Sequence, residues 1–455
     1  MKRLKLISLF HIIFFLAFFS ISSFADVSSS DITAPSAILI DADTGDILFE
    51  KNAHDIMYPA STTKIMTAIL TLENTELNDK VVIDKDTPFT DGNRIYVIEG
   101  EVFTIEQLLY ALMVESANDA AVALAKHIAG SVEEFSKLMN QRAGELGALN
   151  TNFVNPNGLP NEEHVSTAYD LAMIAKHAMT LPKFRELAKT VRYQIPPTNK
   201  QVETRYLKTS NRLLWGVGSR NKILYRGKWI EIKYDVIEGI KTGYTLQAQQ
   251  CLVSTASKNN HRFISVVLKA QGTNIYTDTR TLIDYGLEDF KFVKIVDQTK
   301  KITTVEVING EEKQVDLVTE KQLYKVLPRD FQMKPLESVL EVNETINAPI
   351  EKGELLGKII YKIDNMVLGE VNLVAEKSIS SKDAVTSVYN FSKSLPSKII
   401  NLLLILIILF IVWRSIITII RINRKKKRLL RDNKIERNTI RQITFDKISQ
   451  YYKKR

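Results

Sequence analysis

Two residues with the types and spacing of a nucleophile and its base stand at the head of an apolar run. Ser61 and Lys64 are three positions apart, Pro59 precedes them, and Ile65 to Leu70 follows. Since Pro59 cannot continue a helix from upstream and Ser61 suits a helix start, we expect a helix to begin here. Residues three apart share a helix face, which would bring the Lys64 amine within hydrogen-bonding reach of the Ser61 hydroxyl.

A Ser-x-x-Lys match is weak evidence by itself, because a chain of 455 residues should contain roughly a few such matches by chance. Two more short motifs follow it in order, Ser116-Ala117-Asn118 and Lys241-Thr242-Gly243. Together the three resemble the Ser-x-x-Lys, Ser-Asp-Asn and Lys-Thr-Gly trio of penicillin-binding proteins and class A β-lactamases. The order of the motifs makes Ser61 and Lys64 a candidate catalytic pair.

The charge of the chain is concentrated at its ends. The formal net charge is +9, but residues 421–455 alone carry 14 Lys or Arg against 3 Asp or Glu, and the first five residues add three more basic side chains. The residues between the two ends are therefore net negative. This distribution does not indicate a nucleic-acid-binding domain, and no nucleic-acid partner is expected.

The amino-terminal segment predicts export. Residues 1–25 have a basic start, an apolar core from Leu6 to Phe19, and a small-x-small cleavage pattern at Ser23-Phe24-Ala25. This is typical of a secretory signal peptide. An uncleaved anchor is the alternative, although the apolar core is short for a membrane span.

A second apolar segment, residues 399–420, predicts a transmembrane helix. A membrane span needs about 20 residues, and Arg414 interrupts this run. The segment is therefore long enough only if the Arg414 side chain extends its charged end to the membrane–water interface. A helix lying on the membrane surface is the alternative. Because residues 421–455 are strongly basic, the positive-inside rule places this tail in the cytoplasm and the preceding chain outside the cell membrane.

The intervening sequence predicts an α+β fold. Ala37 to Asp41 and Asp46 to Glu50 form a hairpin pattern, and residues 104–181 carry mostly helical signals, with capping pairs and glycines at the expected ends. Cys251 to Thr255 and Arg262 to Leu268 are predicted as adjacent antiparallel strands. Residues 291–376 contain short segments in which apolar and polar residues alternate, which is typical of a separate β-rich domain. Residues 377–398 form a Ser/Lys-rich linker.

Several motif residues also have purely structural interpretations. Asn118 could cap a following helix from Asp119 to Ile128. Gly243 could permit a close backbone approach by a ligand, or it could mark an ordinary β-bulge. Cys251, the only cysteine, is expected to be a buried core thiol. The histidines are scattered without metal-ligand spacing, so neither a metal nor a cofactor is expected.

Further segments extend the resemblance to the low-molecular-mass penicillin-binding proteins, and most closely to the D-alanyl-D-alanine carboxypeptidases. They are Ala37 to Leu70, Asn155 to Leu159, His164 to Asp170 and Gly239 to Thr245. The resemblance covers residues 34–290, the expected catalytic domain. It implies a β-lactamase/DD-peptidase-like antiparallel sheet with an all-helical lobe, followed by the small β-rich domain and the transmembrane helix.

The resemblance also implies roles for the motif residues. Ser61 would attack the carbonyl between two terminal D-alanines of a peptidoglycan stem peptide, and a neutral Lys64 would take its proton. Ser116 would relay a proton to the leaving amine, and Asn118 would hold the substrate amide. Penicillins and other β-lactams would inhibit the enzyme.

The strand motif would bind the substrate. Lys241 and Thr242 would hold its terminal carboxylate, Gly243 would lie along it, and the backbone N–H groups of Ser61 and Tyr244 would form the oxyanion hole.

Three positions depart from the family pattern, and two other functions remain open. Ala117 replaces a common glycine, Ala248-Gln249 replaces an Ala-Gly step, and Arg280 lies about one turn beyond the position of a carboxylate-binding arginine. A β-lactamase would share the trio but commonly needs a Glu with an Asn four residues on, which Glu162 and Glu163 lack. The other alternative is a non-catalytic wall-binding protein.

Overall fold

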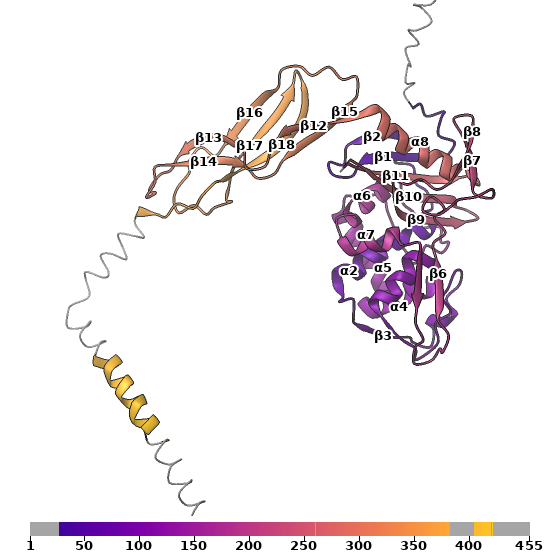
Figure 1. Cartoon of the computed structure of the whole chain (residues 1–455), viewed down its shortest axis with the longest axis horizontal. Helices are drawn as coiled ribbons and strands as arrows, with labels where there is room; N and C mark the ends of the chain where they lie inside the picture. Colours follow the sequence, from indigo (N-terminus) through magenta and orange to yellow (C-terminus); the bar gives the residue numbers. More distant parts are fainter. Residues whose placement is uncertain (1–26, 260, 383–404, 420, 422–455) are drawn as a thin grey trace, which may run out of the picture. The chain divides into compact units, whose positions relative to one another are not determined.

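A computed structural model describes residues 27–259, 261–382, 405–419 and 421 of the chain (Figure 1). The chain divides into two compact units. The first contains the described residues up to Val296 together with Leu323–Leu336 and Ile363–Gly369, and the second contains Asp297–Gln322, Glu337–Lys362 and the described residues from Glu370 onward. The predicted signal peptide lies outside the described residues.

A five-stranded antiparallel sheet forms the framework of the first unit. Its strand order is β2-β1-β11-β10-β9, so β9, which carries the Lys-Thr-Gly motif, lies at an edge. The predicted hairpin and the predicted pair of antiparallel strands are both confirmed. The strands are β1 (Ser36–Asp41), β2 (Ile47–Lys51), β9 (Ile237–Thr245), β10 (Gln249–Lys258) and β11 (His261–Ala270).

Helices cover both faces of this sheet. The helical lobe packs on one face, and α8 (Asn274–Asp289) packs on the other (Figure 1). The lobe contains α2 (Lys64–Asn74), α3 (Ile105–Tyr110), α4 (Asn118–Ala129), α5 (Val132–Glu145), α6 (Ala168–Ala178) and α7 (Pro182–Lys189), with the short helical turns η1 (Ala60–Thr63), η2 (Thr87–Phe89) and η3 (Ala111–Glu115).

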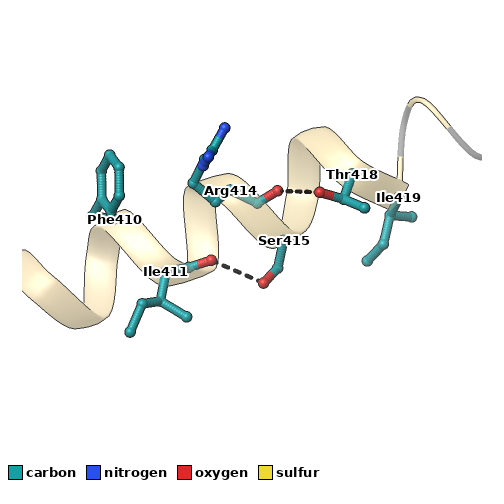
Figure 2. Close-up of a pocket in the computed structure, with 6 residues that line it drawn as sticks. All are labelled: Phe410, Ile411, Arg414, Ser415, Thr418 and Ile419. Atoms are coloured by element: carbon teal, nitrogen blue, oxygen red, sulfur yellow. Dashed lines mark hydrogen bonds between the residues drawn. The ribbon is translucent and has the colours of Figure 1, made fainter. Parts of the chain in front are cut away.

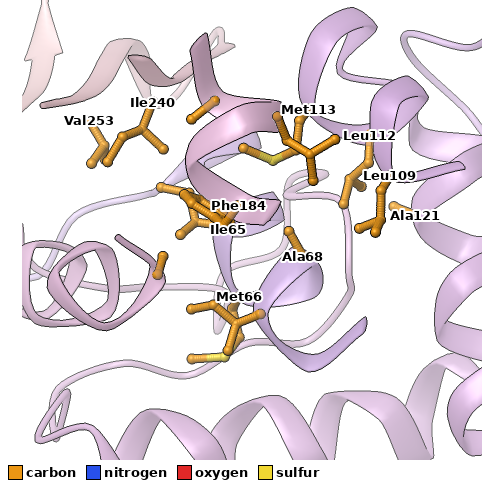
Figure 3. Close-up of a cluster of buried hydrophobic side chains, with 14 of the residues drawn as sticks. Ile65, Met66, Ala68, Leu109, Leu112, Met113, Ala121, Phe184, Ile240 and Val253 are labelled. Carbon is orange, nitrogen blue, oxygen red and sulfur yellow. The ribbon is translucent and has the colours of Figure 1, made fainter. Parts of the chain in front are cut away.

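Successive strand residues point to opposite faces, so the sheet contributes to two separate cores. On β1, Ile38 and Ile40 join the core of the helical lobe, whereas Ala37 and Leu39 join the core beneath α8. Figure 3 shows part of the first core, where side chains of α2 pack against others from η3, α7, β9 and β10. Helix α2 is therefore held firmly at the centre of the lobe, with its amino end directed at the sheet edge.

The helix ends follow the local sequence signals. Thr104 and Gln107 form the predicted capping box at the start of α3, and Ser131 accepts the predicted hydrogen bond from the Glu134 N–H. Gly130 ends α4 with a φ of +81°, a left-handed conformation in which glycine carries no Cβ penalty.

Other strands form two-stranded sheets and a second large sheet. The two-stranded sheets are β3 (Lys80–Val82) with β4 (Val102–Thr104), β5 (Arg192–Ile195) with β6 (Arg205–Lys208), and β7 (Lys222–Tyr225) with β8 (Lys228–Glu231). β12 (Phe290–Val296) pairs with β15 (Leu323–Pro328). The second sheet has the order β13-β14-β18-β17-β16, formed by β13 (Lys301–Glu306), β14 (Gln314–Thr319), β16 (Glu337–Val342), β17 (Leu355–Ile363) and β18 (Met366–Ala375). The β-rich character expected for residues 291–376 is confirmed.

A separate helix spans residues 405–419 (Figure 2). Its Ser415 and Thr418 hydroxyls donate hydrogen bonds back to the carbonyls of Ile411 and Arg414, each at 2.8 Å. Among the described residues, no helix combines the length and the apolar character needed to cross a bilayer. Residues 399–404 and 420 of the predicted span, and all of the basic tail except Arg421, lie outside the described residues.

Candidate active site

The nucleophile turn differs slightly from the predicted helix start. Residues Ala60–Thr63 form the 3₁₀ turn η1, and the α-helix α2 begins only at Lys64. The turn still places Ser61 and Lys64 on one side, with the Lys64 Nζ atom 3.0 Å from the Ser61 Oγ atom. The expected contact between hydroxyl and amine is therefore present in the structure.

Lys64 is fully buried and surrounded by oxygen atoms. Besides Ser61 Oγ, its Nζ atom lies 2.7 Å from Asn118 Oδ1 and 2.6 Å from the backbone oxygen of Asn157. Burial, followed by the positive charge of Lys241, lowers the pKa of Lys64 well below its usual value. The surroundings thus favour the neutral amine, the form in which a lysine can accept a proton.

Asn118 holds this arrangement together and does not cap its helix. The N-cap of α4 is Ala117, and the helix start has no side-chain cap. The Asn118 side chain instead accepts from Lys64 Nζ and donates to the Asp91 carbonyl at 2.7 Å. The capping interpretation is therefore wrong, and the side chain lies beside the amine of Lys64.

Ser116 lies at the break between two helical segments, as predicted. It follows η3, a π-helical turn, and takes a left-handed conformation with φ +63°. Such turns occur frequently at functional sites. The break turns the chain so that α4 can start at Asn118.

The Lys-Thr-Gly strand runs beside the nucleophile turn. Lys241 is buried, and burial lowers its pKa to about 7, while the Glu115 carboxylate acts in the opposite direction. Its Nζ atom donates to the Thr242 carbonyl at 3.0 Å. Tyr244 is half exposed, so the strand is buried at Lys241 and opens to solvent toward its end.

Of the two interpretations of Gly243, the structure excludes the β-bulge. β9 and β10 stay in register around it, so it does not mark a bulge. A Cβ atom at this position would lie 2.9 Å from the backbone nitrogen of Ser61 and 3.1 Å from the Pro59 oxygen. The close neighbour of Gly243 is the nucleophile turn of the chain itself.

The structure adds residues that the sequence motifs did not indicate. Asn157 contacts Lys64 through a backbone carbonyl, which its side-chain type could not reveal. The Ser210 hydroxyl lies 2.6 Å from Thr242 Oγ1, and Glu115 lies close enough to influence the charge on Lys241. His164 belongs to a segment noted for its resemblance, but only the structure shows that it contacts Thr63 beside the nucleophile.

Two of the departures from the family pattern acquire a structural context. Arg280 lies over the ring of Tyr234 and 3.7 Å from Asp284, and neither belongs to the Ser61 group. Gln249, which replaces a glycine, has a φ of +53°, the left-handed region that glycine favours. Cys251 is buried, as predicted.

Comparison with known proteins agrees with this arrangement. The D-alanyl-D-alanine carboxypeptidase family profile matches residues 23–272, and the profile of the penicillin-binding protein 5 C-terminal domain matches residues 290–381. The D-alanyl-D-alanine carboxypeptidase DacF of Bacillus subtilis is 32% identical over 359 residues, which cover 78% of this chain and 87% of the relative. DacA of Haemophilus influenzae is 30% identical over 365 residues, 76% of this chain and 85% of the relative.

Solved structures show the same similarity in three dimensions. Penicillin binding protein 5 from Haemophilus influenzae matches with a TM-score of 0.63 and 28% identity, over 78% of this chain and 100% of that chain. A peptidoglycan synthesis regulatory factor, PBP3, from Streptococcus pneumoniae has a TM-score of 0.61 and 27% identity, over 77% of this chain and 100% of that chain. With its ordered motifs and buried lysine, the chain belongs to the D-alanyl-D-alanine carboxypeptidase family.

Proposed function

We propose that this protein is a serine-type D-alanyl-D-alanine carboxypeptidase that removes the terminal D-alanine of peptidoglycan stem peptides through an acyl-enzyme on Ser61. The observation that carries the proposal is the 3.0 Å contact between the Ser61 hydroxyl and the buried Lys64 amine. Family membership and the activities named for the relatives support the same reaction. Penicillins would acylate the same hydroxyl.

The contacts of Lys64 suit a general base. A neutral lysine has two N–H donors and one lone pair. If the two N–H groups donate to Asn118 Oδ1 and the Asn157 carbonyl, the lone pair is left for the third neighbour, the Ser61 hydroxyl. Lys64 would then accept the serine proton as Ser61 attacks the carbonyl carbon.

The remaining steps follow the pattern that the resemblance to the family implies. The Ser61 and Tyr244 N–H groups would stabilise the tetrahedral oxyanion, and Lys64 and Ser116 would pass a proton to the leaving amine. Breaking of the peptide bond would release D-alanine and leave an ester on Ser61. A water molecule, deprotonated by the same base, would hydrolyse the ester and restore the enzyme.

Lys241 would recognise the carboxylate that distinguishes a terminal D-alanine. An ammonium group has three donors, and among the described residues its hydrogen bonds reach only the Thr242 carbonyl. The unused donors and the neighbouring Thr242 hydroxyl could bind a carboxylate. Because β9 is an edge strand, the substrate backbone could pair with it as an added strand.

We also infer that the catalytic domain, residues 34–290, acts outside the cell membrane. The signal-peptide pattern of residues 1–25 supports export, and the apolar run 399–420 followed by basic residues supports a carboxy-terminal anchor. Along the chain, the β-rich domain 291–376 and the linker 377–398 would then lie between the catalytic domain and the anchor.

The test combines covalent labelling with product release. A fluorescent penicillin should label the protein, and Ser61→Ala should abolish labelling, whereas Ser131→Ala, a change at the start of α5, should not. D-Alanine released from a stem pentapeptide is measured beside penicillin turnover. Undiminished labelling of Ser61→Ala would exclude this nucleophile, and rapid penicillin hydrolysis without D-alanine release would favour a β-lactamase.

A further inference from the structure

The peptide unit between Ala60 and Ser61 is confined on two sides. It contributes the Ser61 N–H, one of the two proposed oxyanion donors. A Cβ atom on Gly158 would overlap the Ala60 carbonyl, and a Cβ atom on Gly243 would lie 2.9 Å from the Ser61 nitrogen. Ala60 is buried and has a φ of +48°, which is unusual for a residue with a side chain. The surrounding structure must therefore hold this peptide in place.

A short series of hydrogen bonds ends on the carbonyl of this peptide. The Thr63 hydroxyl donates to the Ala60 oxygen at 2.8 Å, and the His164 Nε2 atom lies 2.8 Å from the same hydroxyl. On the other side of the ring, His164 Nδ1 accepts from the Val154 N–H at 3.0 Å. His164 is buried, and its ring lies 5.6 Å from that of Phe153.

The bond from Val154 determines the proton positions along this series. Because Nδ1 of His164 accepts a hydrogen bond, the proton of the neutral ring is on Nε2. Nε2–H then donates to the Thr63 oxygen, which leaves the hydrogen of Thr63 directed at the Ala60 carbonyl. Each group in the series is thus fixed as a donor or an acceptor. The Thr63 hydroxyl cannot rotate without losing its buried hydrogen bond to the Ala60 carbonyl.

Fixing the carbonyl also fixes the amide hydrogen. In a planar trans peptide, the C=O and N–H groups point in opposite directions. We propose that His164 and Thr63 are positioning residues that orient the Ser61 N–H toward the oxyanion, by anchoring the carbonyl of the same peptide. This inference rests on the proposed function, because it concerns a step of that reaction. It gives His164 a purpose that none of the three motifs assigns.

The contacts separate this role from that of the general base. Lys64 Nζ contacts Ser61, Asn118 and Asn157, whereas the hydrogen bonds of His164 reach Thr63 and Val154. A change at Thr63 or His164 therefore leaves the proton acceptor with its partners. It should slow formation of the tetrahedral intermediate while leaving binding of the substrate carboxylate nearly unchanged.

Four single variants of the full chain test the proposal. Thr63→Val keeps the branched shape but loses the hydroxyl, and Thr63→Ser keeps the hydroxyl. His164→Phe loses both nitrogens, and His164→Gln keeps one N–H donor on a side chain of similar reach. The rate of acylation by a fluorescent penicillin is separated from non-covalent binding by varying its concentration, and the melting temperature of each variant is measured.

We expect Thr63→Val and His164→Phe to slow acylation by about 10- to 100-fold, which is no more than the rate reduction caused by removing an oxyanion donor outright. Non-covalent binding of the penicillin should change less than about threefold. Thr63→Ser and His164→Gln should recover most of the rate. The Thr63→Val/His164→Phe double variant should be no slower than the worse single variant, because both changes break the same series.

Other results would contradict the proposal. A folded Thr63→Val variant that is acylated about as fast as the parent would overturn it. So would reductions in acylation rate that merely parallel reductions in melting temperature, or reductions that are additive in the double variant. D-Alanine release by the parent protein is measured separately. If the parent is acylated but releases no D-alanine, the proposed function fails while the positioning test remains valid, and if the parent is not acylated, both fail.

Discussion

The two sides of the candidate site are built differently. On the helical side, Lys64 is fully buried and its amine has three oxygen neighbours, including the hydroxyl it would activate. On the strand side, Lys241 is also buried, but its amine donates to one neighbouring carbonyl, and Tyr244 is 53% exposed. The proton-transfer groups are thus assembled before substrate arrives, whereas the strand keeps donors available for it.

The difference suggests a division of labour. A general base acts well only when its distance and protonation state are set in advance. A carboxylate-binding group, in contrast, must still have donors to offer. Changes on the helical side should therefore reduce the chemical rate, and changes on the strand side should mainly affect binding.

The largest effect is expected on the helical side, at Lys64. Lys64→Met removes the proposed base while keeping an unbranched side chain, and it should reduce the acylation rate by about 1,000-fold. Stopped-flow measurement with a fluorescent penicillin would determine the rate. Lys137→Met, at an exposed position of α5, is the matched control. A loss of less than about tenfold in a folded Lys64→Met protein would contradict the assignment of the base.

The second prediction concerns stability in acid. Burial, followed by the charge of Lys64, lowers the pKa of His164 from 6.5 to about 4. Between these values the unfolded chain binds a proton that the folded chain does not, so the free energy of unfolding should fall as the pH is lowered from 6.5 to 4. The full difference corresponds to about 3 kcal/mol.

Urea unfolding at several pH values measures this dependence. Because other groups also titrate in this range, the comparison is made with His164→Gln, which lacks the ionisable ring. The variant should lose this part of the pH dependence. Identical pH profiles for the two proteins would show that His164 is not held neutral in the folded state.

A smaller effect is expected on the strand side. Thr242→Val removes a hydroxyl that lies 2.6 Å from Ser210 Oγ and next to the proposed carboxylate site. We expect KM for a stem pentapeptide to rise by about five- to tenfold while kcat changes less than about twofold, as is usual for loss of one ordinary hydrogen bond of about 1 kcal/mol. Steady-state D-alanine release measures both constants. A fall confined to kcat would remove the proposed contrast between the sides.

The smallest expected effect is a shift of the pH profile. The negative charge of Glu115 raises the pKa of Lys241 against the effect of burial. Glu115→Gln should therefore lower that pKa, so the alkaline limb of kcat/KM, where Lys241 loses its proton, should move to lower pH. The acidic limb, which reports Lys64, should move less. An unchanged alkaline limb would show that Glu115 has no such influence, and a shift to higher pH would contradict the sign of its effect on Lys241.

Much of the fold was predictable from local patterns. The hairpin of β1 and β2, the β10 and β11 pair, and the capping box at Thr104 all depend on residues close in sequence. The contact between Ser61 and Lys64 was predictable for the same reason, although the turn is 3₁₀ where an α-helix was expected. Local spacing determines such features because one or two turns of backbone set the distances.

The environment of that pair depended on distant segments. Asn118 could equally have capped α4, and only the approach of α2 made its amide a partner of Lys64. Gly243 offered two interpretations; the register of β9 with β10 excluded the bulge, and only the packing showed that the Pro59–Ser61 turn lies beside it.

The types of the reactive groups, their order along the chain and the family resemblance could all be read from the amino-acid sequence. The packing of distant segments was needed to show which carbonyl faces Lys64, that His164 lies beside Thr63, and that Ser210 reaches Thr242. These contacts join segments far apart in sequence, and the one from Asn157 to Lys64 uses a backbone oxygen that every residue has. Side-chain patterns carry no information about such atoms until packing brings them together.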